Sequence, residues 1–385
     1  MSKAASRSVT VCILLSMLLS GCAGGMKSKT VIIPDTEASS EPDKVNEDFT
    51  VNKIYTLPDT GFASRDGSCA RCEGDMNSSI VGWMDKNQLL GAYGRELDLS
   101  LERVDYKFNS RQQLMDVKKN ARGVNISPDG SHIIYLAIED FKPILKLLNL
   151  ANNVETVIQE YVFAPFLYDP VSWSNNSQYA AYGKGDEKGR AGSLIAYDIV
   201  DKSAKEYQVP AWSIKEMSLG YKISDDGESA LIIKLSNGQY NLVFGQLKGN
   251  EFISQFEQPI SLDGGFDYIN DDQILFTSLG GALNMFDTRN ATTITLLESV
   301  GGFQLSKDRK YIAYSKDQDE IFVAKIQGNN VINEKSIYKG LIPVQMQWSP
   351  DNKKILLTGR KLYSREKSAP AAIVAIDLPF IIEFK

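Results

Sequence analysis

The sequence contains a single histidine in 385 residues, and this shortage excludes more than any other feature. Histidine supplies most general bases at neutral pH and many metal ligands. Its near absence counts against histidine-dependent hydrolysis and histidine metal clusters. Positive charge is also in deficit, because 42 lysine and arginine residues face 48 acidic residues, a formal net charge of −6. Such a surface repels phosphate backbones, so we expect no nucleic-acid partner.

Familiar catalytic motifs are missing as well. The chain has no G-x-S-x-G elbow, no G-x-x-x-x-G-K-[ST] phosphate loop and no dinucleotide-binding glycine motif. The one histidine, His132, follows a Pro-Asp-Gly turn and is interpreted as a surface or edge residue. The acidic pairs Asp225-Asp226 and Asp271-Asp272 also stand at turns. They are better interpreted as turn-forming residues than as the two carboxylates of a glycosidase. The sequence predicts no enzyme, no cofactor and no metal.

Long apolar runs are absent apart from a short one near the N-terminus. Val9–Leu19 is apolar except for two hydroxyl residues, and it follows positive charges at Lys3 and Arg7. This run is too short to span a bilayer as a mature helix but is typical of a signal peptide. The residues that follow, Leu19-Ser20-Gly21-Cys22, resemble the bacterial lipobox, whose cysteine accepts a lipid through its thiol.

The lipobox implies an exported protein anchored to a membrane. We expect residues 1–21 to be a lipoprotein signal peptide and Cys22 to carry the acyl chains, each buried methylene contributing about 0.8 kcal/mol. Residues 22–50 are polar and are interpreted as a disordered tether. The alternative is an ordinary secretory signal in which Cys22 is incidental. Ala23, in place of the aspartate that retains lipoproteins at the inner membrane, permits an outer-membrane location in a Gram-negative envelope; otherwise the anchor lies in the outer leaflet of the cell membrane.

An internal repeat organises residues 51–385. An apolar or aromatic anchor is followed by serine, a tight turn and an apolar run, as in Ile126-Ser127-Pro128-Asp129-Gly130 before Ile133-Ile134-Tyr135. Pro-Asp-Gly suits such turns, because proline fixes φ and glycine accepts a positive φ. The anchors, including one weak and one degenerate copy, lie 37 to 50 residues apart: Trp83, Ile126, Trp173, Ile223, Tyr268, Leu305 and Trp348.

A second marker follows each complete repeat in phase. It is a strand that ends in a polar turn, as in Ala196-Tyr197-Asp198-Ile199 and Val374-Ala375-Ile376-Asp377. Two markers at a period near 45 residues predict four-stranded units, and such a unit cannot bury both faces alone. The sequence therefore predicts an all-β fold in which the units stack radially as a β-propeller.

The repeats resemble those of the TolB-like propeller family, whose units read Trp-Ser-Pro-Asp-Gly followed by an apolar strand. Trp348–Leu357 is the copy nearest to that pattern and Ile126–Tyr135 the next. The resemblance covers about residues 51–385 and implies the fold more than the function, since propellers host many activities. The chain has no room for the extra α/β domain of TolB itself, so the partners of TolB are not implied.

Seven anchors predict seven blades, with six or eight left open because the first copy is weak. We expect Val51–Leu57 to close the ring as a strand added to the last blade. Residues 380–384 compete for that place.

The candidate binding face carries long loops. Long loops on a rigid scaffold often carry function, and aromatic residues with arginine are typical of protein-binding hot spots. The glycine-rich loops at 263–265, 280–281 and 301–302 are minimal, whereas the loops at 161–170, 183–193, 210–220 and 359–370 are long. An alternative for Phe163 and Phe166 is that they fill a gap between blades. The predicted binding residues are Tyr161, Phe163, Phe166, Tyr168, Arg190, Trp212, Arg360, Tyr363 and Arg365.

Two further cysteines form a C-x-x-C pair, Cys69 and Cys72. In an exported protein this spacing favours a local disulfide. Redox or metal binding is the alternative, although no thioredoxin-like context and no further zinc ligands are present.

Three functions follow as hypotheses of different classes. The first is a non-catalytic binding or scaffold module for a protein or another cell-envelope ligand. The second is an envelope polysaccharide-active enzyme, which requires two carboxylates about 5–10 Å apart in the channel. The third is a redox or metal sensor at Cys69 and Cys72.

Overall fold

Repeated antiparallel sheets make up the described part of the chain. The computed structural model describes residues 49–57, 79–95, 98–108, 110–117, 122–140, 142–160, 171–185, 191–210, 216–317, 319–360 and 377–385. The predicted signal peptide, Cys22, Cys69 and Cys72 lie outside these residues. Within them, strands dominate, and no helix has the length and apolar character to cross a bilayer.

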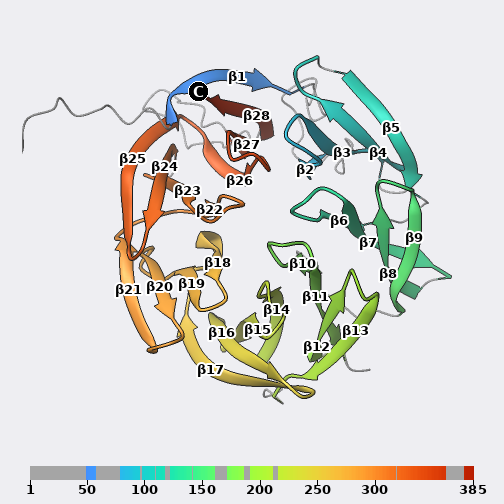
Figure 1. Cartoon of the computed structure of the whole chain (residues 1–385), viewed down its shortest axis with the longest axis vertical. Helices are drawn as coiled ribbons and strands as arrows, with labels where there is room; N and C mark the ends of the chain where they lie inside the picture. Colours follow the sequence, from blue (N-terminus) through green and yellow to red (C-terminus); the bar gives the residue numbers. More distant parts are fainter. Residues whose placement is uncertain are drawn as a thin grey trace, which may run out of the picture. The chain divides into compact units, whose positions relative to one another are not determined.

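Each blade is a meander of four strands, numbered in Figure 1. The first blade contains β2 (Ser79–Trp83), β3 (Gln88–Arg95), β4 (Asp98–Asp105) and β5 (Ser110–Val117). The second contains β6 (Arg122–Ile126), β7 (His132–Glu139), β8 (Lys142–Asn149) and β9 (Val154–Glu160). The third contains β10 (Val171–Trp173), β11 (Tyr179–Gly185), β12 (Ala191–Asp198) and β13 (Ser203–Gln208).

The remaining blades repeat this order. The fourth contains β14 (Glu216–Ile223), β15 (Ser229–Ser236), β16 (Gln239–Lys248) and β17 (Glu251–Pro259). A short 3₁₀ turn, η2 (Leu262–Gly264), leads to the fifth, with β18 (Phe266–Asn270), β19 (Gln273–Thr277), β20 (Leu283–Asp287) and β21 (Thr292–Leu297). The sixth contains β22 (Phe303–Leu305), β23 (Tyr311–Lys316), β24 (Glu320–Gln327) and β25 (Asn330–Lys339).

The last blade combines the two ends of the described chain. It contains β26 (Ile342–Trp348), β27 (Lys354–Arg360), β28 (Asp377–Phe384) and, outermost, β1 (Val51–Thr56). β1 runs antiparallel to β28, with Ile54 opposite Ile382 (Figure 1). The predicted closing strand is therefore in place, and residues 380–384 form the third strand rather than competing for the fourth position.

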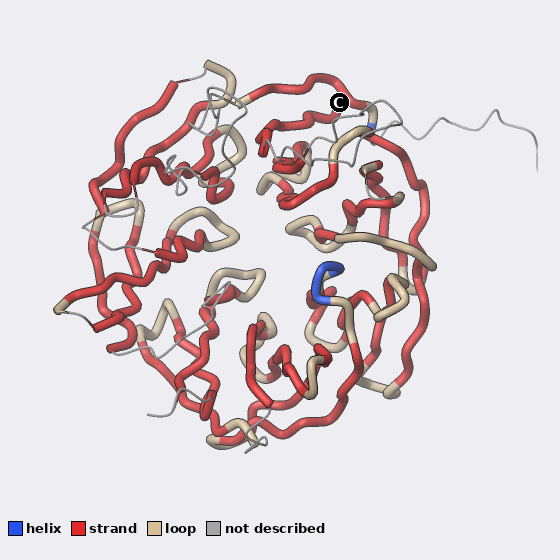
Figure 2. Tube along the Cα trace, turned by 180° about the vertical axis from the view of Figure 1, so that it is seen from behind, coloured by secondary structure: helices blue, strands red, loops and turns tan. Residues whose placement is uncertain are grey.

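The described strands form five four-stranded sheets and one eight-stranded sheet. The larger sheet consists of the third and fourth blades, joined where Gln208 of β13 pairs in parallel with Glu251 of β17. Its two halves are each a four-stranded meander, so the described chain contains seven four-stranded units. Viewed from behind, they surround a common centre (Figure 2), which confirms the all-β propeller.

The repeated serine explains the turns between the first and second strands, here called the inner turns. In five blades the serine hydroxyl accepts a hydrogen bond from the backbone N–H five residues later, as Ser224 Oγ does from Ser229 at 3.0 Å. The same hydroxyl donates to an Asp or Asn two residues on, as from Ser224 to Asp226 at 2.5 Å. One buried side chain thus satisfies both sides of the turn, which is why the motif recurs.

The core lies between neighbouring blades. Where the ring closes, Phe49 packs its ring edge-on against Tyr311, Trp348 and Phe384, with centroids 5.1, 6.3 and 5.6 Å away. Phe49 is 4% exposed. The packed part of the chain therefore includes a residue that the sequence assigned to the tether.

Candidate functional site

The predicted loop residues fall almost wholly outside the described chain. This applies to Tyr161, Phe163, Phe166, Tyr168, Arg190, Trp212, Tyr363 and Arg365. Arg360 is the exception, since its backbone ends β27 opposite Ile342. These residues stay predictions, and the site described below comes from the channel.

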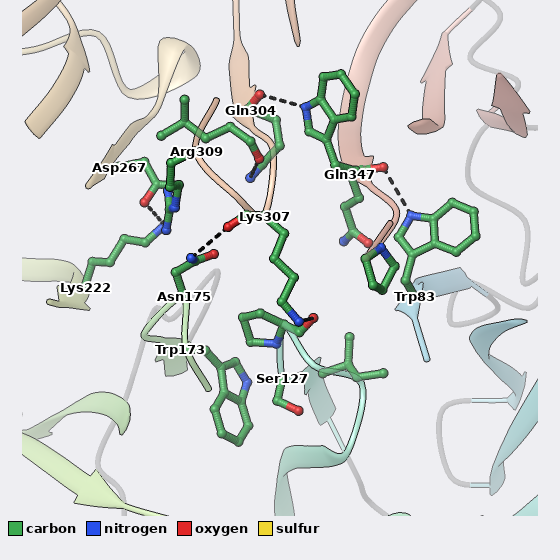
Figure 3. Close-up of a pocket in the computed structure, with 15 residues that line it drawn as sticks. Trp83, Ser127, Trp173, Asn175, Lys222, Asp267, Gln304, Lys307, Arg309 and Gln347 are labelled. Carbon is green, nitrogen blue, oxygen red and sulfur yellow. Dashed lines mark hydrogen bonds and ion pairs between the residues drawn. The ribbon is translucent and has the colours of Figure 1, made fainter. Parts of the chain in front are cut away.

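Two cavities lie along the channel. One, of 210 Å³, is lined by the inner turns and the ends of the innermost strands and is called the turn-side cavity (Figure 3). The other, of 900 Å³, is lined by the short glycine-rich connections before β18 and β22 and by β26, and is called the loop-side cavity. Gln304 and Gln347 line both, so these two side chains stand where the cavities meet.

The residue directly before each anchor, here called the pre-anchor residue, ties neighbouring blades together. Asn125 Nδ2 donates to the carbonyl of Val171 in the next blade at 2.9 Å. Gln347 Nε2 makes the equivalent bond to the carbonyl of Val81 at 3.1 Å. Because strand residues alternate between faces, the apolar anchor packs between blades while its polar neighbour faces the channel.

A buried carboxylate extends this connection over three blades. Asp267, the pre-anchor residue of the fifth blade, contacts Lys222 Nζ of the fourth blade at 2.7 Å and Arg309 Nη1 of the sixth at 2.9 Å. It also accepts the N–H of Tyr268 at 2.7 Å. Burial alone would raise the pKa of Asp267, but Arg309 and Lys222 outweigh it and hold this pKa below its usual range. The carboxylate therefore stays charged.

Three anchor tryptophans stand around the turn-side cavity. Trp83 Nε1 donates to the carbonyl of Gln347 at 3.2 Å, and Trp348 Nε1 donates to the carbonyl of Gln304 at 3.1 Å. Each indole thus binds the pre-anchor carbonyl of the preceding blade. Trp173 occupies the equivalent position in the third blade and is 6% exposed. Its Nε1 has no hydrogen-bond partner among the described residues.

Lys307 lies among the side chains that line the turn-side cavity (Figure 3). Its Nζ lies 3.4 Å from the carbonyl oxygen of Pro128, in the inner turn of the second blade. Its own carbonyl accepts from Asn175 Nδ2, in the inner turn of the third blade, at 3.0 Å. The sixth blade lies across the ring from the neighbouring second and third blades, so the inner turns of all three converge near the axis (Figure 1).

The charged side chains of this cavity are mostly cations. Its described lining holds three cations, Lys222, Lys307 and Arg309, and a single carboxylate, Asp267. A glycosidase needs two carboxyl groups, one of which is protonated at the working pH. Asp267 has no carboxylate neighbour in this lining and is held ionised by two cations. Within the described residues there is also no group of three or more His, Cys, Asp or Glu side chains that could hold a metal.

His132 lies beside an inner turn, half-buried, as the sequence indicated. Its Nε2 is 3.0 Å from Asn149 Nδ2, and the Oδ1 of this amide accepts from the N–H of Ala151 at 2.9 Å. Asn149 therefore presents its donor to Nε2, which must be an acceptor. Nδ1 then donates to Ser131 Oγ at 2.7 Å. The imidazole is neutral in this network.

We expect His132 to titrate below its ordinary pKa of 6.5, because burial lowers this pKa and outweighs the opposing effect of Asp129. In the unfolded chain the imidazole gains its proton first. The free energy of unfolding should thus fall as the pH drops below about 6.5. With one histidine, a single imidazole resonance gives the value directly by NMR titration. A pKa at or above 6.5 would contradict the network.

Sequence reasoning missed the pre-anchor residues, although a signal for them exists. Six of the seven are polar, among apolar neighbours: Asn125, Ser172, Lys222, Asp267, Gln304 and Gln347, with Gly82 the exception. An alignment of the seven repeats on their anchors would have shown that the preceding position is polar in six of them. The pairing of Lys222 with Asp267 follows from these residues only once neighbouring blades are placed side by side, and Arg309, the second partner of Asp267, lies outside the set.

Comparison with known proteins adds the fold alone. No protein-family model matches the chain, and no curated protein matches it in sequence. A chain of the mitotic checkpoint complex superposes with a TM-score of 0.54 at 12% identity, over 88% of this chain and 96% of that one. Hydrazine synthase of Kuenenia stuttgartiensis gives 0.51 at 12% identity, over 76% and 94%. The tricorn protease gives 0.48 at 14% identity over 69% of this chain, which spans only 31% of that protein.

Proposed function

We propose that the protein is exported, anchored through a lipid on Cys22, and acts as a non-catalytic TolB-like propeller that binds a protein or another ligand of the cell envelope. The anchor rests on the lipobox-like Leu19–Cys22 after an apolar run. The binding role rests on one observation above all, the channel lining of fixed donors and aromatic rings around an ion-paired carboxylate.

That lining supports binding rather than hydrolysis. Asp267 remains ionised and already bonded to two cations, so it neither donates a proton nor attacks a substrate. The donors around it are held by contacts between blades, which makes the surface rigid before any ligand arrives. Pre-organised groups lose little entropy on binding.

The anchor is tested with a Cys22→Ser variant. We expect the wild type in the membrane fraction and the variant released, because one thiol carries the lipid. Mass spectrometry of the N-terminal peptide should detect acyl chains on Cys22 of the wild type. An unmodified Cys22 in a membrane-free protein would contradict the proposal.

The binding role is tested by crosslinking in cells followed by affinity purification. Wild type is compared with a variant in which Tyr161, Phe166, Trp212 and Arg365 are alanine. We expect the wild type to enrich an envelope partner that the variant loses, since aromatic and arginine side chains dominate such interfaces. Circular dichroism of the variant controls for folding. Equal enrichment by both forms would remove the loop face from the proposal, and hydrolysis of envelope glycans would replace the proposal with an enzyme.

A further inference from the structure

An unsatisfied donor marks the turn-side cavity. Trp83 and Trp348 each bond a carbonyl of the preceding blade, whereas the buried Nε1 of Trp173 has no partner among the described residues. A buried N–H without an acceptor is costly, and native proteins rarely leave one. Trp173 lines the cavity (Figure 3), so a ligand in it can supply the missing acceptor.

The charge of the cavity selects the sign of that ligand. Three cations and one carboxylate line it, an excess of positive charge inside a protein whose formal net charge is −6. Asp267 is shared between Lys222 and Arg309, so it compensates neither completely. Lys307 has only the distant carbonyl of Pro128 as a side-chain partner among the described residues. Low-dielectric walls strengthen the attraction for an anion.

The size and shape of the cavity limit the ligand further. Its volume is 210 Å³, enough for one side chain or one chain end but not for a folded domain. Pro128, Leu305 and Pro350 supply apolar walls near the cations. A carboxylate at the end of a short apolar stem matches this arrangement, because its two oxygens accept from separate donors.

We propose that the turn-side cavity binds a single carboxylate of an acidic peptide segment, with Lys307 and Arg309 as cations and the Trp173 indole as a neutral donor. The carboxylate belongs either to an aspartate or glutamate side chain or to a chain terminus. This inference rests on the proposed function and names the chemistry of one ligand subsite. It places that subsite on the side of the inner turns.

The test uses the four indole N–H signals of the protein in NMR, one for each tryptophan. Three probes are titrated: N-acetylglutamate α-amide, N-acetylglutamine with a free α-carboxylate, and the neutral N-acetylglutamine amide. Trp173→Phe identifies the Trp173 signal. We expect a carboxylate probe to shift this signal and leave the bonded indoles of Trp83 and Trp348 largely unmoved. The probe that binds identifies the carboxylate as a side chain or a terminus.

Matched lysine variants of one inner turn provide the control. Lys307→Gln removes the cation at the cavity, and Lys310→Gln removes an equal charge from a lysine whose side chain is 68% exposed. Loss of a charge-assisted hydrogen bond should weaken carboxylate binding about tenfold in Lys307→Gln and leave it unchanged in Lys310→Gln. Trp173→Phe should weaken it about threefold to tenfold by calorimetry.

The proposal is overturned if neither carboxylate shifts Trp173, if the neutral amide shifts it equally, if inorganic phosphate binds and the carboxylates do not, or if the two lysine variants behave alike. Partner capture separates this failure from that of the proposed function. If carboxylates fail while the wild type still captures an envelope partner, only the subsite is lost. If carboxylates bind through Lys307 and no partner is captured, the subsite stands and the proposed function is lost.

Discussion

Replacing Asp267 with asparagine is expected to lower the free energy of unfolding by about 3–5 kcal/mol. The variant keeps the volume of the side chain but removes the charge that Lys222 and Arg309 share across three blades. Two partly buried cations are then left close together without a compensating carboxylate. Urea denaturation followed by tryptophan fluorescence measures the loss as a shift of the midpoint.

Lys310→Ala is the matched control for the Asp267 variant. Lys310 approaches Asp308 only to 3.9 Å on an exposed surface, so its removal should change stability by about 0.5 kcal/mol or less. The Asp267 contribution should also depend on pH. Since this pKa is lowered in the folded protein, the contribution is complete above the ordinary value of 3.8 and disappears as the pH falls through the folded value. An asparagine variant as stable as wild type would refute the assigned role.

Replacing Phe49 with alanine is expected to cost about 3–5 kcal/mol. The ring of Phe49 is buried against Tyr311, Trp348 and Phe384, immediately before β1. The substitution leaves a cavity where the first and last parts of the described chain meet. Denaturation measures the global loss, and hydrogen exchange should show faster exchange of the β1 amides than of the central strands.

Phe108→Ala provides the comparison for Phe49. Phe108 is 80% exposed, so removing its ring should change the free energy of unfolding by about 0.5 kcal/mol or less. If both variants lose similar stability, or if the β1 amides stay protected in the Phe49 variant, the closure of the ring does not depend on this contact.

Much of the fold could be predicted from the sequence because its determinants are local. The serine and the acidic residue two places on stabilise the turn by themselves, and the apolar run that follows is the next strand. Each clear copy of the motif therefore predicts a hairpin. The closing strand was predictable because Val51–Thr56 is an isolated β-type segment before the first repeat. The end of the tether was harder to predict, since nothing in the neighbouring sequence distinguishes Phe49 as a core residue.

The channel site depends on relations that sequence order hides. Lys222 and Asp267 are in adjacent blades, and Lys307 reaches the second blade across the axis. No local pattern reveals that the indole of Trp173, unlike those of Trp83 and Trp348, has no acceptor within the described part of the chain. The prediction chose the long loops instead, because aromatic and arginine residues in a loop are easier to recognise in a sequence than single polar residues inside apolar strands.

The pairing of β1 with β28 also sets an order of events during synthesis. β1 leaves the ribosome before every other strand of the ring, and its partner β28 leaves after all of them. Until then β1 has no partner, and the blades behind it form an open arc with exposed edges. Closure of the ring therefore needs both ends of the described chain. A chain that stops before β28 leaves the edge of β1 unpaired, whereas a chain containing both strands can pair it.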